Sequence, residues 1–139
     1  MRTLRDFLKE INEKKLICFG TGLMAEEALR YEPIRQAVVC LVDNDVRKQG
    51  CEIELGGQFF PVIAPTELPA HLDENTVILL TSGHYRAMEK QLKGMEFSVQ
   101  PEIYAFPELK VAYSAGSEEF FEERFLKECL KEYEVVLEQ

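Results

Sequence analysis

A tight glycine turn between an apolar run and a helix-like stretch constrains this chain more than any other feature. Residues 16–19 form a short apolar run without a helical period, long enough for one buried strand. Gly20, Gly22 and Ala25 follow with the spacing G-x-G-x-x-G/A. In this pattern the first glycine permits the bend, the second lets a ligand approach the backbone, and the third small residue lets helix and strand pack closely. Free N–H groups at the start of such a helix can hold an anion, so the turn predicts an anionic ligand.

Composition and charge limit the class of protein and its partners. With 139 residues, of which 46% are hydrophobic and 29% charged, the chain is expected to form one globular domain. We divide residues 1–139 into a leading helix over 1–14, a core over 15–106 and an amphipathic carboxyl-terminal helix over 117–138. The net charge of −9 and the lack of a basic block in the sequence argue against nucleic acid and anionic membranes as partners.

Cysteine usage and hydropathy indicate the compartment. Cys18 and Cys40 lie inside apolar strand candidates, and no two cysteines have the C-x-x-C spacing. No histidine follows at a metal-ligand spacing, so we expect neither a disulfide framework nor a metal site. No run in the sequence approaches the ~18 apolar residues of a membrane span, and the amino-terminal segment is amphipathic. We therefore expect a cytoplasmic protein without a signal peptide.

Four more strand candidates follow the first, and most of them alternate with helices. The five candidates are residues 16–19, 37–42, 61–64, 76–81 and 102–106. Such alternation predicts a Rossmann-like α/β fold, a three-layer sandwich whose mostly parallel five-stranded sheet has helices on both faces. Right-handed crossovers favour the strand order 3-2-1-4-5. One interval departs from the alternation, because residues 51–60 predict a hairpin with its turn at Gly56-Gly57.

Capping residues and prolines predict where the helices begin and end. The expected helices cover residues 3–14, 23–31, 65–68, 85–94 and 117–138. Thr3 and Asp6 form a capping pair at the start of the first helix. The second helix should end before Pro33, and Pro69 should close the third, since the residue before a proline disfavours the helical region. Residues 110–116 are interpreted as a connector.

Three polar stretches fall at the carboxyl ends of the predicted strands, where ligands bind in sheets of this kind. The predicted binding residues are Gly20, Thr21, Gly22, Leu23, Met24, Asp43, Asn44, Asp45, Ser82, Gly83 and His84. Asp43 lies 21 positions after Gly22, close to the ~20-residue offset at which an acidic residue accepts hydrogen bonds from ribose hydroxyls. The alternative for Asp43 is a plain turn at the strand end. The ribose interpretation predicts that residues 15–106 bind a nucleotide.

His84 is the one predicted rim residue whose pKa range suits acid–base catalysis. The alternatives are a contact with a ligand phosphate and a side chain that faces solvent. No nucleophile, orienting carboxylate or metal partner can be assigned beside it from the sequence. We therefore assign no catalytic residue, keep His84 as the sole candidate, and favour a chain without catalytic activity of its own.

The order of several short motifs resembles a known family. The motifs are Phe19-Gly20-Thr21-Gly22, Leu41-Val42-Asp43-Asn44-Asp45, Lys48-Gln49-Gly50, Gly57 and the stretch over 61–68. They resemble the small Rossmann-like domain of bacterial surface-polysaccharide enzymes, such as the amino-terminal domain of sugar-nucleotide acyltransferases and of membrane-bound nucleotide-sugar epimerase/dehydratases. The resemblance implies a nucleotide or nucleotide-sugar pocket at residues 20–24 and 43–45. Two departures are Thr21, where alanine is common, and the long stretch over 51–60.

Three functions remain open at this point. The first is binding of a nucleotide-sugar or an NAD-like ligand in bacterial sugar-nucleotide or surface-polysaccharide metabolism, as a non-catalytic or accessory domain. The second is a small enzyme that uses NAD or S-adenosylmethionine. The third is an interaction or scaffold protein with a vestigial nucleotide site. An apolar stripe on the helix over 117–138 covers either the chain's own core or a seam with a second copy or a partner enzyme.

Overall fold

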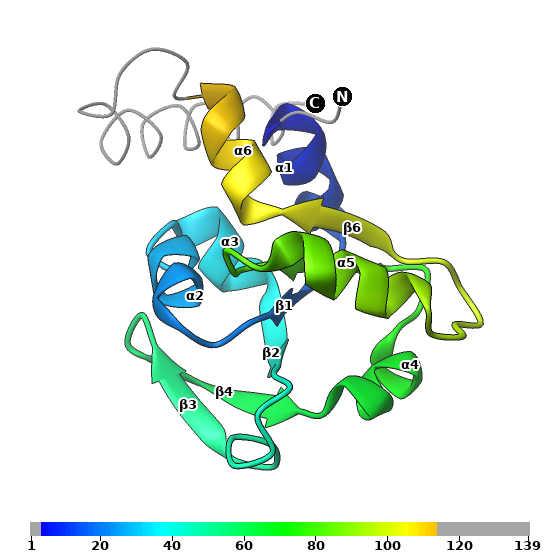
Figure 1. Cartoon of the computed structure of the whole chain (residues 1–139). Coiled ribbons are helices and arrows are strands. Elements are labelled where there is room, and N and C mark those ends of the chain that lie inside the picture. Colours follow the sequence, from blue (N-terminus) through cyan, green and yellow to red (C-terminus); the bar gives the residue numbers. More distant parts are fainter. Residues whose placement is uncertain (1–3, 114–139) are drawn as a thin grey trace.

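The computed structural model describes residues 4–113, which form a Rossmann-like α/β fold (Figure 1). A six-stranded sheet lies between two layers of helices. The predicted capping residue Thr3 and the helix predicted over 117–138, with its apolar stripe, lie outside the described residues. Within residues 4–113 no helix is long and apolar enough to cross a membrane.

Strands and helices alternate through most of the described chain. The strands are β1 (Lys15–Phe19), β2 (Val38–Val42), β3 (Glu52–Leu55), β4 (Gln58–Ile63), β5 (Thr76–Leu80) and β6 (Glu102–Ala105). The helices are α1 (Leu4–Glu13), α2 (Leu23–Ala28), α3 (Glu32–Ala37), α4 (Leu68–His71), α5 (Tyr85–Lys93) and α6 (Phe106–Tyr113), with a 3₁₀ turn at Pro65–Glu67. The one interval without a helix is that between β2 and β4, as the sequence predicts.

The sheet has the order β3-β4-β2-β1-β5-β6, with β1 in the middle and the β3–β4 hairpin at one end (Figure 1). All pairs are parallel except β3 with β4. The predicted order 3-2-1-4-5 corresponds to β4-β2-β1-β5-β6, but the predicted count of five strands is wrong. The second arm of the hairpin continues directly into the strand expected over 61–64, so its first arm joins the sheet as a sixth strand. Gly56 and Gly57 make the hairpin turn with φ of +60° and +81°, which favours glycine at both positions.

Successive side chains of the central strands pack into two separate cores, one on each face of the sheet. In β1, Leu16 and Cys18 point into one core while Ile17 and Phe19 point into the other. The first core also holds buried side chains of α1, α2, α3 and α6, and the second holds those of α4 and α5. A strand buried on both faces reads as a continuous apolar run, which explains why β1 shows no alternation of polar residues.

Three prolines lie inside the first turn of a helix, and for two of them, Pro33 and Pro69, the sequence suggested only that they end one. The helix predicted over 23–31 is α2, which ends before Pro33 as expected. Pro33 itself lies in α3, a separate short helix that the sequence did not predict. Pro69 begins α4 instead of closing a turn. Pro107 lies at the start of α6, which runs to Tyr113 and occupies part of the predicted connector. Proline is tolerated there because the first N–H groups of a helix have no partner within the helix.

Asp73 ties the starts of the two central parallel strands together. Its carboxylate accepts a hydrogen bond from Lys15 Nζ at 3.0 Å, from Thr76 Oγ1 at 2.8 Å and from the Asn75 backbone N–H at 2.7 Å. Lys15 begins β1 and Thr76 begins β5. The bond from Lys15, followed by those from Thr76 and Asn75, lowers the pKa of Asp73 to about 2.

We expect Asp73→Asn to lower the free energy of unfolding at pH 7. Folding lowers the pKa of Asp73 from its usual value of about 3.9, so the stability from its contacts is complete above that pH and is lost as the pH falls towards 2. The difference between the wild type and Asp73→Asn should therefore shrink over this range. Urea denaturation at several pH values measures it, with Glu74→Gln, an exposed neighbour, as the control. A constant difference from pH 7 down to pH 2 would contradict the prediction.

Candidate functional site

A pocket of about 280 Å³ opens at the carboxyl ends of the central strands. Its lining residues come from the ends of β1, β2 and β5 and from the segments that follow them. They are Gly20, Thr21, Gly22, Leu23, Met24, Asp43, Thr81, Ser82, Gly83 and Met88. In the sheet, β1 lies between β2 and β5. The chain adds β2 on one side of β1 and later adds β5 on the other side, so the pocket lies where the strand order reverses. Ligands of open α/β sheets bind at this position.

Most of the residues that the sequence predicted for the site meet in this pocket. The exceptions are Asn44, Asp45 and His84, which do not line it. Two lining residues, Thr81 and Met88, were not predicted as site residues. Thr81 follows the last residue of β5, where the sequence suggested only the end of a strand. The partly buried side chain of Met88 also packs against the second core.

The glycines of the pocket serve two different purposes. Gly20 has φ of +121°, and a Cβ built on it would lie 2.6 Å from the Thr81 carbonyl oxygen, so the fold itself requires glycine there. Gly22 and Gly83 are different, because a Cβ on either would meet no atom within 4 Å. Neither has a φ that favours glycine. Space over these two residues is therefore open to a ligand.

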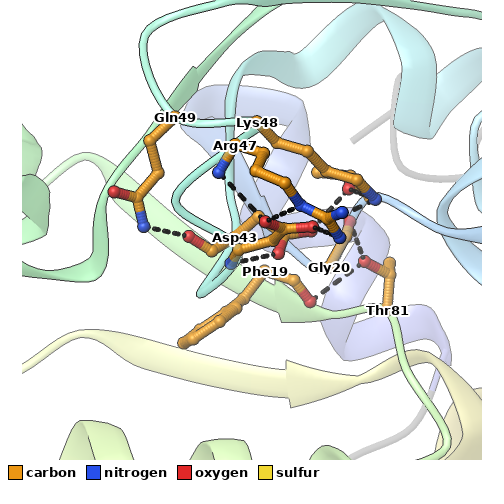
Figure 2. Close-up of polar contacts among 9 residues, drawn as sticks. Phe19, Gly20, Asp43, Arg47, Lys48, Gln49 and Thr81 are labelled. Carbon is orange, nitrogen blue, oxygen red and sulfur yellow. Dashed lines mark hydrogen bonds and ion pairs between the residues drawn. The ribbon is translucent and has the colours of Figure 1, made fainter.

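Thr81 joins the ends of β1 and β5 underneath the pocket. Its backbone N–H donates to the Phe19 carbonyl at 2.9 Å. Its hydroxyl lies 3.1 Å from the same carbonyl oxygen and 3.0 Å from that of Gly20 (Figure 2). Since Thr81 is 2% exposed, these bonds satisfy a buried hydroxyl and fix the turn against β5.

Asp43, at the end of β2, carries the main polar contacts of the pocket (Figure 2). Its Oδ2 accepts a hydrogen bond from Thr21 Oγ1 at 2.5 Å, and its Oδ1 accepts one from the Asp45 backbone N–H at 2.8 Å. The Asp43 carbonyl accepts a bond from Gln49 Nε2 at 2.9 Å. The carboxylate is thus held by the glycine turn on one side and by its own loop on the other.

Lys48 completes this cluster, and the sequence analysis did not select it as a site residue. Its Nζ donates to Thr21 Oγ1 at 3.0 Å and lies 3.9 Å from Asp43 Oδ2. The only sequence signal for it was the Lys-Gln-Gly motif within the family resemblance. The neighbouring Arg47 pairs with Asp45 instead, at 3.0 Å, and this pairing lowers the pKa of Asp45. Asp45 is therefore engaged outside the pocket.

Asn44 connects the loop after β2 to helix α5. Its Nδ2 donates to Gln91 Oε1 at 3.1 Å, and Gln91 Nε2 donates to Asn44 Oδ1 at 2.9 Å. Gln91 lies one helical turn from Met88, a lining residue of the pocket. The pair of amides therefore fixes one wall of the pocket relative to the loop that carries Asp43.

His84 lies beside the pocket at the N-cap of α5 and is exposed. Its backbone N–H donates to Ser82 Oγ at 3.0 Å. Its imidazole makes no hydrogen bond or ion pair with any residue of 4–113. No acid–base partner therefore orients the ring, as an assisted general base would need.

The described residues form no metal centre, and two of their cysteines are buried in the core. Among residues 4–113 no group of three or more His, Cys, Asp and Glu side chains could hold a metal ion. Cys18 and Cys40 are buried free thiols, and burial raises the pKa of both, to about 11 for Cys40. They are core residues, since a thiol with a raised pKa is a poor nucleophile at neutral pH.

Comparisons with known proteins find a structural similarity but no matching sequence. No protein-family model and no curated protein sequence matches the chain. Among solved structures, the chain is similar to one described as RSP, a Rex-family repressor, with 13% sequence identity and a TM-score of 0.45. The match covers 84% of this chain and 65% of the length of that protein. A likeness at this level carries no statement about function.

The two kinds of glycine should respond differently to substitution. We expect Gly20→Ala to lower the free energy of unfolding by about 2 kcal/mol or more, because alanine combines backbone strain with a clash at the Thr81 carbonyl. Gly83→Ala should change it by no more than about 0.5 kcal/mol, since its Cβ enters open space. Urea denaturation of both variants measures the contrast. Equal losses of stability would mean that Gly83 is also needed by the fold.

Proposed function

We propose that this chain binds a nucleotide-containing small molecule, a nucleotide-sugar or an NAD-like compound, in the pocket over the glycine turn. The observation that carries the proposal is the open space over Gly22 and Gly83 beside the carboxylate of Asp43. The fold does not need glycine at these two positions, whereas a ligand that packs against the backbone does.

Asp43 supports the ribose or sugar part of this proposal. A carboxylate has about four acceptor positions, and contacts with Thr21 and Asp45 use two of those of Asp43. Its remaining positions can accept hydrogen bonds from a pair of ligand hydroxyls without breaking the contacts that hold the carboxylate. The side chain is 17% exposed, so the reduced screening by water strengthens such bonds.

The volume of the pocket sets the size of the bound part. Pockets for small molecules span roughly 300–1,000 Å³, and this one, at about 280 Å³, lies just below that range. A sugar with its phosphates fills such a volume, while a base or second sugar would extend past the rim. The narrower expectation of a role in surface-polysaccharide metabolism has no support from the comparisons, and the proposal does not depend on it.

A binding role explains the pocket better than the two alternatives. For an enzyme using NAD or S-adenosylmethionine, the only candidate catalytic residue, His84, lies outside the pocket lining. For a scaffold with a vestigial site, nothing would favour glycine at two positions whose Cβ atoms would enter open space. We therefore propose a non-catalytic binding module.

A thermal-shift screen of ligand-stripped protein tests the proposal. The probes are NAD, NADP, S-adenosylmethionine and UDP-, GDP- and CDP-sugars. A ligand at 100 times its Kd stabilises the folded state by about 2.7 kcal/mol, which corresponds to a rise of several degrees in Tm. We expect such a rise with at least one nucleotide or nucleotide-sugar.

The variant Gly22→Glu should abolish this rise while keeping the Tm of the free protein, since it fills the pocket with a bulky anion and clashes with no neighbouring atom at Cβ. Ala87→Glu adds the same charge at an exposed position of α5 outside the lining and should keep the full response. A panel in which no nucleotide shifts the Tm of the wild type would overturn the proposal.

A further inference from the structure

Lys48 has capacity for binding that the protein itself does not use. An ammonium group carries three N–H donors, and within residues 4–113 Lys48 Nζ makes one hydrogen bond, to Thr21 Oγ1. The distance of 3.9 Å to Asp43 Oδ2 is an ion pair without a hydrogen bond. The side chain is 41% exposed. Two donors at the end of this side chain are thus available to a further acceptor.

The same corner of the pocket offers unused acceptors next to these donors. Asp43 keeps about two acceptor positions after its contacts with Thr21 and Asp45, as described above. Lys48 does not line the pocket itself, but its ammonium lies close to Thr21 and Asp43, which do (Figure 2). The positively charged ammonium of Lys48, with unused donors, and the negatively charged carboxylate of Asp43, with unused acceptors, therefore lie 3.9 Å apart.

We propose that Lys48 and Asp43 form a sugar-phosphate subsite, in which Lys48 binds a phosphate group and Asp43 binds free hydroxyls of the sugar that carries it. A plain diol would use only the acceptors of Asp43, and a free phosphate only the donors of Lys48. A phosphorylated ribose or hexose satisfies both. The inference names the ligand class for the proposed nucleotide site and rests on that function for its sugar part.

The charge of the molecule makes a local cation necessary for such a ligand. With a net charge of −9, the protein repels anions at long range. Asp43 alone would repel a nearby phosphate further, whereas Lys48 compensates its charge. The other cation of this loop, Arg47, is occupied by both carboxylate oxygens of Asp45 and is 87% exposed. Lys48 is thus the cation of this loop that adjoins the lining residues.

Dissociation constants of paired ligands test the role of Lys48. The pairs are UDP with uridine and ADP with adenosine, which differ only in the phosphates, measured by calorimetry on the full chain. We expect Lys48→Met to raise the Kd of the diphosphates by about ten- to a hundredfold and that of the nucleosides by less than about threefold. Only the diphosphates lose a charge-assisted contact. Lys48→Arg should recover most of the loss. Arg47→Gln removes the same charge from the same loop and should leave all four constants unchanged.

A purely structural role for Lys48 predicts a different result. If Lys48 only holds Asp43 and Thr21 in position, Lys48→Met raises the Kd of nucleosides and of diphosphates by the same factor. That result would overturn the proposed subsite. Unchanged constants would overturn it as well. Inorganic pyrophosphate provides a readout that needs no nucleotide. It should raise the Tm of the wild type and of Arg47→Gln but not that of Lys48→Met.

The pyrophosphate result separates the two proposals. If no nucleotide binds the wild type but pyrophosphate stabilises it through Lys48, the nucleotide function fails and the phosphate contact stands. If nucleotides bind but the binding of pyrophosphate and of the diphosphates does not depend on Lys48, the proposed subsite is overturned and the proposed function stands. If neither pyrophosphate nor any nucleotide has an effect, both proposals are overturned.

Discussion

The close approach of Gly20 to Thr81 is the contact on which the rest of the site depends. Because Gly20 has no side chain, its backbone lies against the Thr81 carbonyl, and the Thr81 hydroxyl bonds back to the carbonyls of Phe19 and Gly20. On the other side, the Gly20 N–H donates to the Val42 carbonyl at 2.8 Å. The ends of β1, β2 and β5 are therefore locked together at one point. This fixed edge is what allows residues from three distant parts of the chain to line one small pocket.

The polar residues of this edge divide into those that build it and those that face outwards. The Thr81 hydroxyl contacts the backbone beneath the pocket. The Thr21 hydroxyl donates a hydrogen bond to Asp43 and accepts one from Lys48. Asp43 and Lys48 keep part of their hydrogen-bonding capacity. These contacts orient the carboxylate of Asp43 and the ammonium of Lys48 within the fold itself. Such preorganisation reduces the cost of binding for any ligand that uses these groups.

The sequence predicted the parts of this structure that have a strong local cause. Continuous apolar runs marked the buried parallel strands, and the glycine spacing marked the turn. The prolines misled the prediction, because Pro33 and Pro69 were expected only to end a helix, whereas each lies in the first turn of one. Proline breaks a helix interior but fits its first turn, and only the tertiary fold decides which applies. Lys48 and Thr81 were not predicted as site residues for another reason. The role of Thr81 depends on backbone carbonyls of another strand, and that of Lys48 on a side chain of the distant glycine turn. A lysine in a polar loop also has no local pattern that distinguishes it.

The missing helix between β2 and β4 explains how Lys48 reaches the site. Two parallel neighbours need a connection that returns to the other end of the sheet, and a helix over one face commonly provides it. Here β3 makes the return within the sheet, paired with β4. The chain after Asp43 therefore turns back at the carboxyl edge, where the Gly50 N–H donates to the Val62 carbonyl and the Val62 N–H to that of Cys51, both at 2.9 Å. This turn keeps the loop that carries Lys48 against the glycine turn, whereas a crossover helix would lead the chain away over one face of the sheet. The departure from the usual α/β alternation and the position of Lys48 beside the pocket are thus two results of the same hairpin.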